Sequence, residues 1–350
     1  MQSKIFSRLF DEEQPVFVIA EAGVNHNGSL ELAKKLVDAA KSVGADAVKF
    51  QTFCAEEMVC KNARKADYQK KNDLKNETQF EMLKKLELKP IDFKLLAQYC
   101  AKKRLAFLSS PFDHKSVDLL ESLKMPVYKI ASGEITNFPL LEYIGKKRKP
   151  VILSTGMATL KEIRDAVALL KRTGTKKIAL LHCITSYPAR DEVLNLKAIQ
   201  TLKKKFALPV GFSDHSQGTV AAAAAVALGA GVIEKHFTLD NFMPGPDHRA
   251  SLDPQAMTKM VKNIRTIEKA LGDGKKIPSS EEKVIKKLAR KSLVASKNIA
   301  RGEKISLAMV TSKRPQGGIS PVYYKKVVGR RARQDISKDS IIHWKMLSKV

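Results

Sequence analysis

The chain has 350 residues, of which 44% are apolar, so it is long enough for one large domain with a hydrophobic core and one small domain. Its formal net charge of +27 is compatible with three interpretations: a surface that binds nucleic acid or a membrane, electrostatic steering of an acidic substrate, or a lysine-rich surface that is only solvated. The basic residues are mostly lysine, are spread along the chain and lack interleaved aromatic residues, which favours the last two interpretations and disfavours nucleic acid as a partner.

Two features of the sequence bear on its compartment. The first fifteen residues contain acidic side chains and no apolar core, which disfavours a signal peptide, and the longest apolar run, residues 220–233, is too short to span a bilayer. Cys54, Cys60, Cys100 and Cys183 show no metal-like spacing, as expected of reduced thiols. We therefore expect a cytoplasmic protein with no membrane association.

Apolar segments of strand length alternate with amphipathic segments through most of the chain. The first strand is expected at residues 16–21, before the turn AGVNHNG. The second, residues 47–53, carries Lys49 and Gln51 on one face because side chains alternate along a strand. Residues 54–79 are polar and charged, which is typical of a lid or binding loop. Six further strands are expected at residues 106–110, 127–131, 151–154, 178–183, 208–212 and 231–233, and helices include residues 30–43, 160–170, 194–202, 219–230 and 257–271.

This alternation predicts a (β/α)8 barrel of the α/β class. A doubly wound open sheet is the alternative, but no glycine-rich fingerprint follows the first strand. We expect the barrel over residues 1–272, a linker over 273–291 and a small β-rich domain over 292–350. The small domain holds thirteen basic and three acidic residues, a net charge of +10.

A histidine follows each of the last two predicted strands, in the segments SDH and EKH. Because parallel strands deliver their carboxyl ends to one rim, His215 and His236 are expected to lie close together. Two imidazoles with Asp214, Glu234 and Asp247 nearby suit a borderline divalent cation with open coordination positions. The competing interpretation is that each histidine only ends a strand.

Polar residues also follow the other predicted strands, at the end of the barrel where such enzymes bind substrate. Some of the Ser and Thr residues are explained as helix N-caps. Capping does not explain Lys49 and Lys129, which lie inside apolar strands, where an unpaired charge is costly. Two lysines and several hydroxyls make a plausible site for a small, highly charged anion such as a phosphorylated acid.

Several segments together resemble the motifs of the sialic acid synthase family. They are AEAGVNHNG, AVKFQTF, SSPFD, KIASGEITNFPLL, ILSTGM, LLHCITSYPA, GFSDH, EKHFTLD and GPDHRASLDP, and the tail with KRPQGGISP resembles the family's C-terminal antifreeze-like (SAF) domain. The resemblance implies an enzyme that condenses phosphoenolpyruvate with an N-acetylated mannosamine-type sugar. It further implies a divalent metal, Mn2+ or Mg2+, and a domain-swapped homodimer.

The resemblance also assigns roles to individual residues. His215 and His236 would hold the metal, with Glu234 acting through a water. Arg314 would come from the SAF domain of a partner subunit and hold the sugar's N-acyl group. The other implied site residues are Lys49, Lys129, Ser110, Ser132 and Ser154 for phosphoenolpyruvate, and Glu21, Gln51, Glu134, Thr185, Tyr187, Ser213 and Asp247 for the sugar and the reacting centre. Glu134 is the first choice for the proton-accepting carboxylate and Glu21 the second.

Three alternatives stay open at this point. The first choice of sugar is N-acetylmannosamine, which would give N-acetylneuraminate. The alternative is 2,4-diacetamido-2,4,6-trideoxymannose, which would give N,N'-diacetyllegionaminate, and Thr185 departs from some relatives at a position that bears on this choice. A Schiff-base barrel aldolase would use Lys49 or Lys129 as its nucleophile and needs no metal. A polyanion-binding protein would be expected to carry clustered arginine and aromatic residues, and aromatic residues make up only 6% of this chain.

Overall fold

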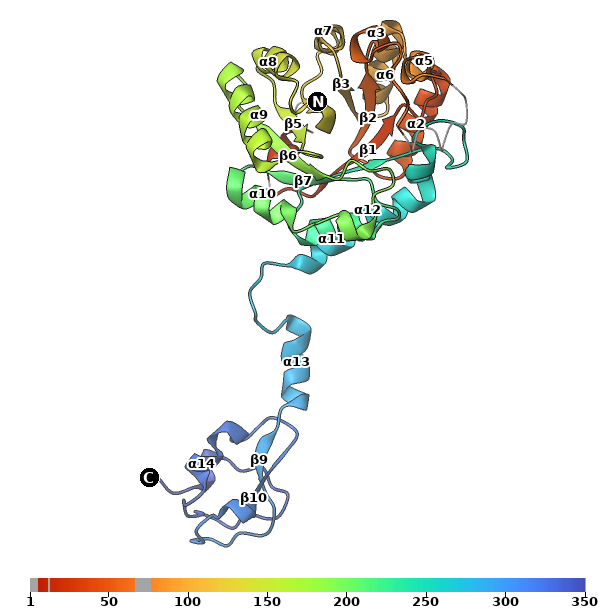
Figure 1. Cartoon of the computed structure of the whole chain (residues 1–350). Coiled ribbons are helices and arrows are strands. Elements are labelled where there is room, and N and C mark those ends of the chain that lie inside the picture. The colour runs from red at the N-terminus through yellow and green to blue at the C-terminus, as the bar shows by residue number, and fades with distance from the viewer. Residues whose placement is uncertain (1–5, 12, 67–76, 350) are drawn as a thin grey trace. The chain divides into compact units, whose positions relative to one another are not determined.

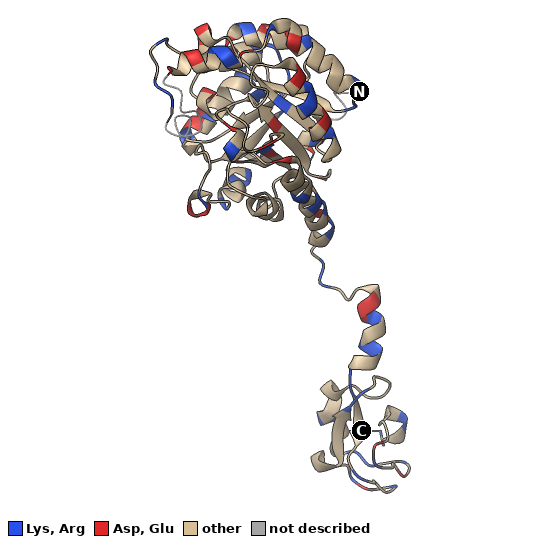
Figure 2. Cartoon of the chain, turned by 90° about the vertical axis from the view of Figure 1, so that its right-hand side faces the viewer, with Lys and Arg blue, Asp and Glu red and all other residues tan. Residues whose placement is uncertain are grey.

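The structure is a computed structural model that describes residues 6–11, 13–66 and 77–349. The chain forms two compact units, residues 1–272 and 273–350. Basic and acidic residues both occur along the ribbon of each unit (Figure 2). Within the described residues, none of the helices has the length and apolar character needed to cross a membrane.

Eight parallel strands form the inside of the first unit, and helices surround them (Figure 1). The strands are β1 Phe17–Gly23, β2 Ala47–Thr52, β3 Ala106–Pro111, β4 Tyr128–Ile130, β5 Val151–Ser154, β6 Ile178–Cys183, β7 Val210–Asp214 and β8 Val232–His236. They are ordered β3-β2-β1-β8-β7-β6-β5-β4, and the two edge strands, β3 and β4, contact each other. The predicted (β/α)8 barrel is confirmed.

The outer layer consists of helices that bury one apolar stripe against the strands. Its α-helices are α2 Leu30–Ser42, α3 Ala55–Met58, α5 Gln79–Leu86, α6 Pro90–Lys102, α7 His114–Ser122, α8 Phe138–Lys146, α9 Leu160–Thr173, α10 Ala198–Phe206, α11 Val220–Ala227 and α12 Pro254–Leu271. Short 3-10 turns are η1 Ser7–Phe10, η2 Ser132–Glu134, η3 Asp191–Val193 and η4 His248–Ala250. Helix α9 shows why these segments are helical. Thr159 and Glu162 form a capping box at its start, and Ile163, Val167 and Leu170 are buried on one face.

Several predicted boundaries were wrong in ways that matter for the site. The seventh and eighth strands were expected to end at residues 212 and 233, but β7 and β8 continue through Asp214 and His236. The parallel ladder extends through the pairs Ser213↔Glu234 and Asp214↔Lys235, so these polar side chains are held by strands rather than by loops. Helix α11 is shorter than predicted, because Leu228 caps it and Gly229 follows with a φ of +95°.

The predicted loop over residues 54–79 contains helix α3 and reaches the start of α5, and its residues 67–76 lie outside the described part of the chain. Helix α5 begins with a capping box between Thr78 and Glu81. Its buried side chains join Val24 and Phe53 in a small apolar cluster that is separate from the main barrel core. Residues Met82, Leu83 and Leu86 of α5 therefore form part of the rim of the barrel.

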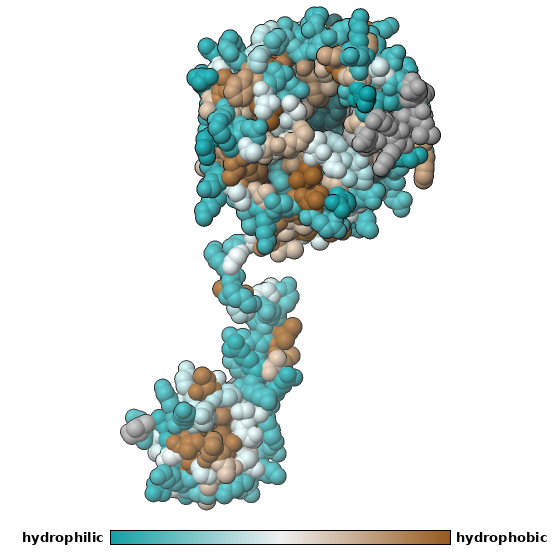
Figure 3. All heavy atoms as spheres, in the orientation of Figure 1, coloured by the Kyte–Doolittle hydropathy of each residue, from teal (hydrophilic) through white to brown (hydrophobic). Residues whose placement is uncertain are grey.

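The second unit has its own small core. Helix α13 Ser280–Ala289 precedes two antiparallel strands, β9 Ser292–Ala295 and β10 Val310–Lys313, and the remaining short elements are η5 Leu307–Met309, η6 Pro321–Tyr323, α14 Tyr324–Val327 and η7 Trp344–Met346. Leu293, Ile299 and Ile342 are among its buried side chains. Helix α13 exposes Val284 and Leu288. Figure 3 shows brown, hydrophobic atoms along one side of this helix.

Candidate active site

A cavity of about 650 Å³ opens at the carboxyl end of the barrel strands. Every site residue that the family resemblance implies within the first unit, except Glu134, lines this cavity. These residues are Glu21, Lys49, Gln51, Ser110, Lys129, Ser132, Ser154, Thr185, Tyr187, Ser213, His215, Glu234, His236 and Asp247. They come from all eight strands or the loops that directly follow them, so the barrel topology collects residues that are far apart in the sequence.

Four buried charges alternate in sign across the floor of the cavity. The ammonium of Lys49 lies 2.8 Å from Glu21 and 3.7 Å from Glu234, and the ammonium of Lys129 lies 3.4 Å from Glu234. All four side chains are at least nine-tenths buried. Both buried lysines therefore have a carboxylate partner, as expected because an unpaired buried charge is costly.

Hydroxyl groups complete this network. Lys49 donates to Ser110 Oγ at 3.2 Å, Lys129 donates to Ser154 Oγ at 2.8 Å, and Ser213 donates to Glu234 Oε1 at 2.9 Å. These contacts follow from strand register, because Lys129 is paired with Ile152 of β5, two residues before Ser154. The arrangement presents two ammonium groups and several hydroxyls to one cavity, which is a donor set suited to an anion with more than one acidic group.

The charges shift one another's pKa values in opposite directions. Burial raises the pKa of Glu21 above its usual range, more than the neighbouring Lys49 lowers it. Burial also raises the pKa of Glu234, but Lys129 and Lys49 outweigh it and hold this pKa low. For Lys129, burial is the largest cause and its pKa is lowered. Such opposed shifts within one cavity are typical of a catalytic site.

The two histidines predicted as metal ligands lie side by side at the rim. Their ring centroids are 5.4 Å apart, and the ring of Tyr187 lies 4.2 Å from that of His215. His215 Nδ1 donates to the carbonyl oxygen of Ile184 at 2.8 Å, so Nε2 carries the lone pair, and the thiol sulfur of Cys183 lies 3.9 Å from it. Burial lowers the pKa of His215 to about 4 and that of His236 far below its usual value, so both rings are neutral at neutral pH.

This donor set fits a divalent cation. Neutral imidazoles are common metal ligands, and a ligating histidine usually donates its other ring nitrogen to a carbonyl, as His215 does. His236 Nδ1 is buried and has no hydrogen-bond partner among the described residues, and the same holds for Glu234 Oε2. His236 Nδ1 is the kind of group that a bound cation or its water would satisfy, whereas Glu234 Oε2 already has the Lys49 ammonium 3.7 Å away.

Another group of potential ligands lies outside the cavity. Cys54, Glu56 and Glu87 have ligand atoms within 4.8 Å of one another, although the cysteine spacing alone did not predict this. The ammonium of Lys84 lies 3.0 Å from Glu56 and 3.2 Å from Glu87. Because a lysine already neutralises these carboxylates and the group is partly exposed, we assign no metal to it.

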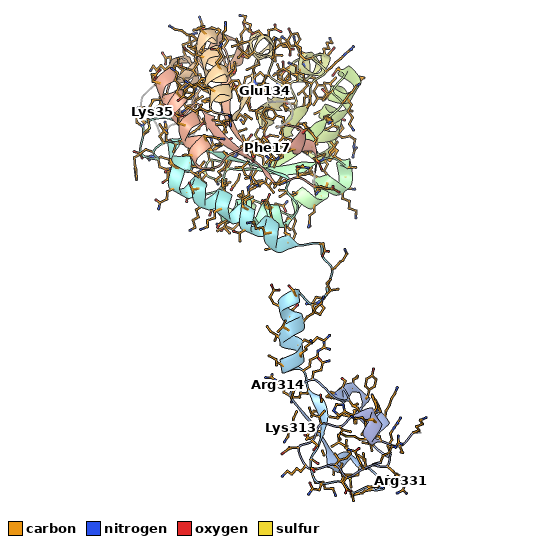
Figure 4. The ribbon with its side chains drawn as sticks, turned by 180° about the vertical axis from the view of Figure 1, so that it is seen from behind. Phe17, Lys35, Glu134, Lys313, Arg314 and Arg331 are labelled. Atoms are coloured by element: carbon orange, nitrogen blue, oxygen red, sulfur yellow. The ribbon has the colours of Figure 1, made fainter. Side chains whose placement is uncertain are left out.

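One predicted residue of the first unit, Glu134, does not line the cavity. Glu134 follows Gly133, which lines the cavity, but its carboxylate accepts a hydrogen bond from Asn137 at 2.7 Å (Glu134 is labelled in Figure 4). Burial raises the pKa of Glu134 as well. Arg314 lies on an exposed loop of the second unit and makes no hydrogen bond or ion pair with any residue that the structure describes.

The structure also shows functional features that sequence reasoning missed or misread. Asp214, expected near the metal, instead pairs with the buried Lys235 at 2.9 Å. The reason is strand alternation: Ser213 faces the cavity, so Asp214 faces away from it. An apolar part of the cavity wall was also missed. It is formed by Val24, Met82, Leu83, Leu86 and Phe112.

Comparison with known proteins adds the family. The NeuB family profile matches residues 36–276, and the SAF domain profile matches residues 290–348. The N,N'-diacetyllegionaminic acid synthase of Campylobacter jejuni is 52% identical over 93% of this chain and 98% of its own. The enzyme of the same name from Legionella pneumophila is 47% identical over 94% of this chain and 93% of its own. A crystal structure of N-acetylneuraminic acid (sialic acid) synthetase from Leptospira borgpetersenii matches with a TM-score of 0.69 and 38% identity, over 78% of this chain and 90% of that one.

Proposed function

Because the chain belongs to the NeuB family and is a nonulosonic acid synthase, we propose that it condenses phosphoenolpyruvate with an N-acetylated mannosamine-type sugar and water, releasing phosphate. The observation that carries this proposal is the row of buried charges Glu21–Lys49–Glu234–Lys129 beside the histidine pair. With all four groups ionised the row is neutral overall. A dication held by the two histidines would therefore leave the site positive, as an anionic substrate requires.

In this proposal the lysine side of the cavity holds phosphoenolpyruvate. Lys49 and Lys129 bind its phosphate and carboxylate, and Ser110, Ser132 and Ser154 donate further hydrogen bonds. The lysines stabilise the reaction most where negative charge builds up on the departing phosphate. Their electrostatic interaction is strong there because little water screens them inside the cavity.

His215 and His236 would hold Mn2+ or Mg2+, with Glu234 binding one of its waters. When bound, such a cation would act as a Lewis acid on the aldehyde of the open-chain sugar. The residues of the chain supply the rest of the site. Tyr187, whose ring lies against that of His215, and Asp247 line the part of the cavity next to the histidines, where the sugar would bind.

The reaction needs one carboxylate to accept a proton. A bond forms between C3 of phosphoenolpyruvate and the aldehyde carbon, and the aldehyde oxygen takes up a proton to become a hydroxyl. Water adds at the resulting cationic C2, and the C2–O bond to phosphate then breaks as the C2 ketone forms. The proton lost by the water passes to a carboxylate. We keep Glu134 and Glu21 as the two candidates. Glu21 already lies in the cavity, whereas Glu134 must first leave its hydrogen bond to Asn137.

For the sugar we propose 2,4-diacetamido-2,4,6-trideoxymannose, with N,N'-diacetyllegionaminate as the product. The apolar wall supports this choice, because that sugar presents a C6 methyl and two acetyl methyls, which apolar side chains bind without leaving a hydroxyl unpaired. Sequence identity supports this choice as well, because it is 52% and 47% to the two legionaminic acid synthases and 38% to the Leptospira enzyme. N-acetylmannosamine is the second candidate, supported by the structural likeness to the Leptospira enzyme.

We further propose that the active enzyme is a domain-swapped homodimer in which Arg314 binds the N-acyl group of the sugar in the partner's barrel. Two observations on the second unit support this. The guanidinium of Arg314 is exposed and makes no hydrogen bond or ion pair with the described residues. Helix α13 leaves Val284, Ile285 and Leu288 more than half exposed, which is apolar surface that a partner could cover.

The proposed function is tested by release of phosphate. Purified protein is incubated with phosphoenolpyruvate, Mn2+ and each of the two sugars, and inorganic phosphate is measured over time. We expect release to require the sugar and the metal, and to be fastest with the diacetamido sugar. Release at the same rate without any sugar would contradict the condensation. Faster release with N-acetylmannosamine would overturn only the choice of sugar.

A further inference from the structure

The two proposed metal-binding histidines depend on two neighbouring strands. His215 directly follows β7 and His236 is the last residue of β8. A cation that binds both rings fixes the distance between them to within a few tenths of an ångström. Whatever sets the spacing and register of these two strand ends therefore affects metal affinity.

Immediately beside the histidines, a fully buried ion pair crosses from one strand to the other. Asp214 precedes His215 and Lys235 precedes His236, and the two residues are direct partners in the β7–β8 register. The Lys235 ammonium lies 2.9 Å from Asp214 Oδ2, and both side chains have an exposed fraction of 0%. Ser213 and His236 line the cavity, so strand alternation turns Asp214 and Lys235 to the opposite face of the sheet.

Ser216, the residue after His215, contacts both members of this ion pair. Its backbone N–H and its hydroxyl both donate to Asp214 Oδ1, at 2.8 Å and 2.7 Å. Its carbonyl oxygen accepts from the Lys235 ammonium at 2.5 Å. The residues on both sides of His215 are thus tied to the residue before His236, and three hydrogen bonds together with one ion pair join the two ligands through their backbones.

Stability alone is a weak reason for such a pair. Removing two charges from water is costly, and a buried ion pair can often be replaced by apolar residues of similar volume with no loss of stability. What the pair supplies here is geometry: two directional contacts to Lys235 and two to Asp214, all within three residues of a histidine. Groups behind metal ligands commonly change metal affinity by about 10–100-fold when they are removed.

We infer that Asp214, Lys235 and Ser216 are positioning residues that set the spacing of His215 and His236 and so raise the affinity of the site for its divalent cation. This inference rests on the proposed function, because it takes the two histidines as the metal ligands. It concerns residues that touch neither the substrates nor the cation. Their effect should therefore appear in metal binding before any catalytic step is considered.

The test is a direct measurement of Mn2+ binding to the full-length protein without substrates, with free Mn2+ detected by electron paramagnetic resonance. The double variant Asp214→Asn/Lys235→Met removes both charges together, so no single charge is left buried. We expect its dissociation constant for Mn2+ to rise about tenfold or more, with a circular dichroism spectrum and melting temperature close to those of the control. The control is Asp118→Asn/Lys147→Met, which removes a surface pair of the same residue types whose atoms are 2.9 Å apart.

A folded double variant that binds Mn2+ within about twofold of the unmodified protein would overturn the inference. If the double variant does not fold, Ser216→Ala decides, because it removes one hydroxyl donor and leaves both charges paired. We expect about threefold weaker Mn2+ binding from this milder change, and an unchanged dissociation constant would overturn the inference. His236→Ala separates the two proposals: if it binds Mn2+ as tightly as the unmodified protein, the metal assignment itself is wrong and the inference falls with it.

Discussion

At the scale of single residues, the sequence located most of the cavity but not the roles within it. Lys49 and Lys129 stood out because a lysine inside an apolar strand needs a partner, and the structure gives each of them a glutamate. Asp214 was misread because the predicted strand ended too early, which hid the alternation that turns this side chain away from the cavity. The pairing of Asp214 with Lys235 depends on strand register, which no local sequence pattern specifies.

Lys129→Met tests the anion site. We expect the KM for phosphoenolpyruvate to rise at least tenfold, because the variant loses the ammonium, 2.8 Å from Ser154 Oγ, that we propose to bind the phosphate or the carboxylate. The KM for the sugar should change far less, and kcat should fall as well. Steady-state kinetics with each substrate varied in turn measures this. Equal losses for both substrates would indicate general damage to the cavity. Lys149→Met, on the outside of the barrel, is the matched control.

His26 makes the stability of the barrel depend on pH. Burial lowers its pKa from 6.5 to about 4, so the folded state favours the neutral ring, and unfolding takes up a proton between these two pH values. Its contribution to stability is therefore present above pH 6.5 and is lost as the pH falls toward 4, by about 2 kcal/mol at pH 5. His248, whose pKa is also lowered to about 4, acts in the same direction.

The measurement is urea unfolding of the unmodified protein and His26→Gln at pH 7.5 and pH 5, followed by far-ultraviolet circular dichroism. Glutamine keeps an acceptor for the Gly28 N–H but does not titrate. We expect the loss of unfolding free energy between the two pH values to be smaller in the variant. The same loss in both proteins would contradict the assignment to His26. His114→Gln, at an exposed position, serves as the control.

At the scale of elements, strands and long helices could be predicted because their periodicity is strong, whereas the α5 region could not. Residues 54–79 contain many charges and read as a loop, yet α5 begins at Gln79 with a capping box and carries three apolar side chains into the cavity wall. The apolar residues Met82, Leu83 and Leu86 were present in the sequence. Their contact with Val24 and Phe112 is a tertiary feature that no short pattern shows.

Leu83→Gln tests this wall as a determinant of the sugar. A glutamine there offers hydrogen bonds to a hydroxyl and removes apolar contact for a methyl group, each worth about 1–3 kcal/mol. We expect kcat/KM for 2,4-diacetamido-2,4,6-trideoxymannose relative to N-acetylmannosamine to fall about tenfold or more, with the KM for phosphoenolpyruvate little changed. An unchanged ratio in a folded variant would remove the wall from the selection of the sugar. Leu95→Gln, a partly exposed leucine of α6 that does not line the cavity, is the control.

At the scale of the whole molecule, the barrel and the β-rich second unit were predicted correctly, because alternating strands and helices followed by short β-like segments leave few other architectures. What remained open is which barrel Arg314 serves. The segment between α12 and β9 contains glycine, proline and many charges, and such a linker is compatible with folding back or with exchange between subunits. Chain composition does not distinguish these two arrangements.

A mixing experiment distinguishes them. Arg314→Ala should be nearly inactive alone, and Lys129→Met should have low activity alone when phosphoenolpyruvate is kept well below its raised KM. In an exchanged heterodimer, one of the two sites combines an intact Lys129 with an intact Arg314, so a refolded equal mixture should regain up to about a quarter of the unmodified activity. No recovery, with heterodimers verified by native mass spectrometry, would mean that Arg314 acts on its own barrel or on none. A refolded mixture of each variant with itself is the control.

The central claim is the condensation itself, and the mass of the product tests it most directly. The protein is incubated with Mn2+, phosphoenolpyruvate and 2,4-diacetamido-2,4,6-trideoxymannose, and the mixture is examined by mass spectrometry with and without borohydride. The account predicts a product with the mass of sugar plus phosphoenolpyruvate plus water minus phosphoric acid, lost when the metal is chelated, with no borohydride-trapped adduct on the protein. A metal-independent reaction with a trapped adduct on Lys49 or Lys129 would contradict it and identify a Schiff-base aldolase instead.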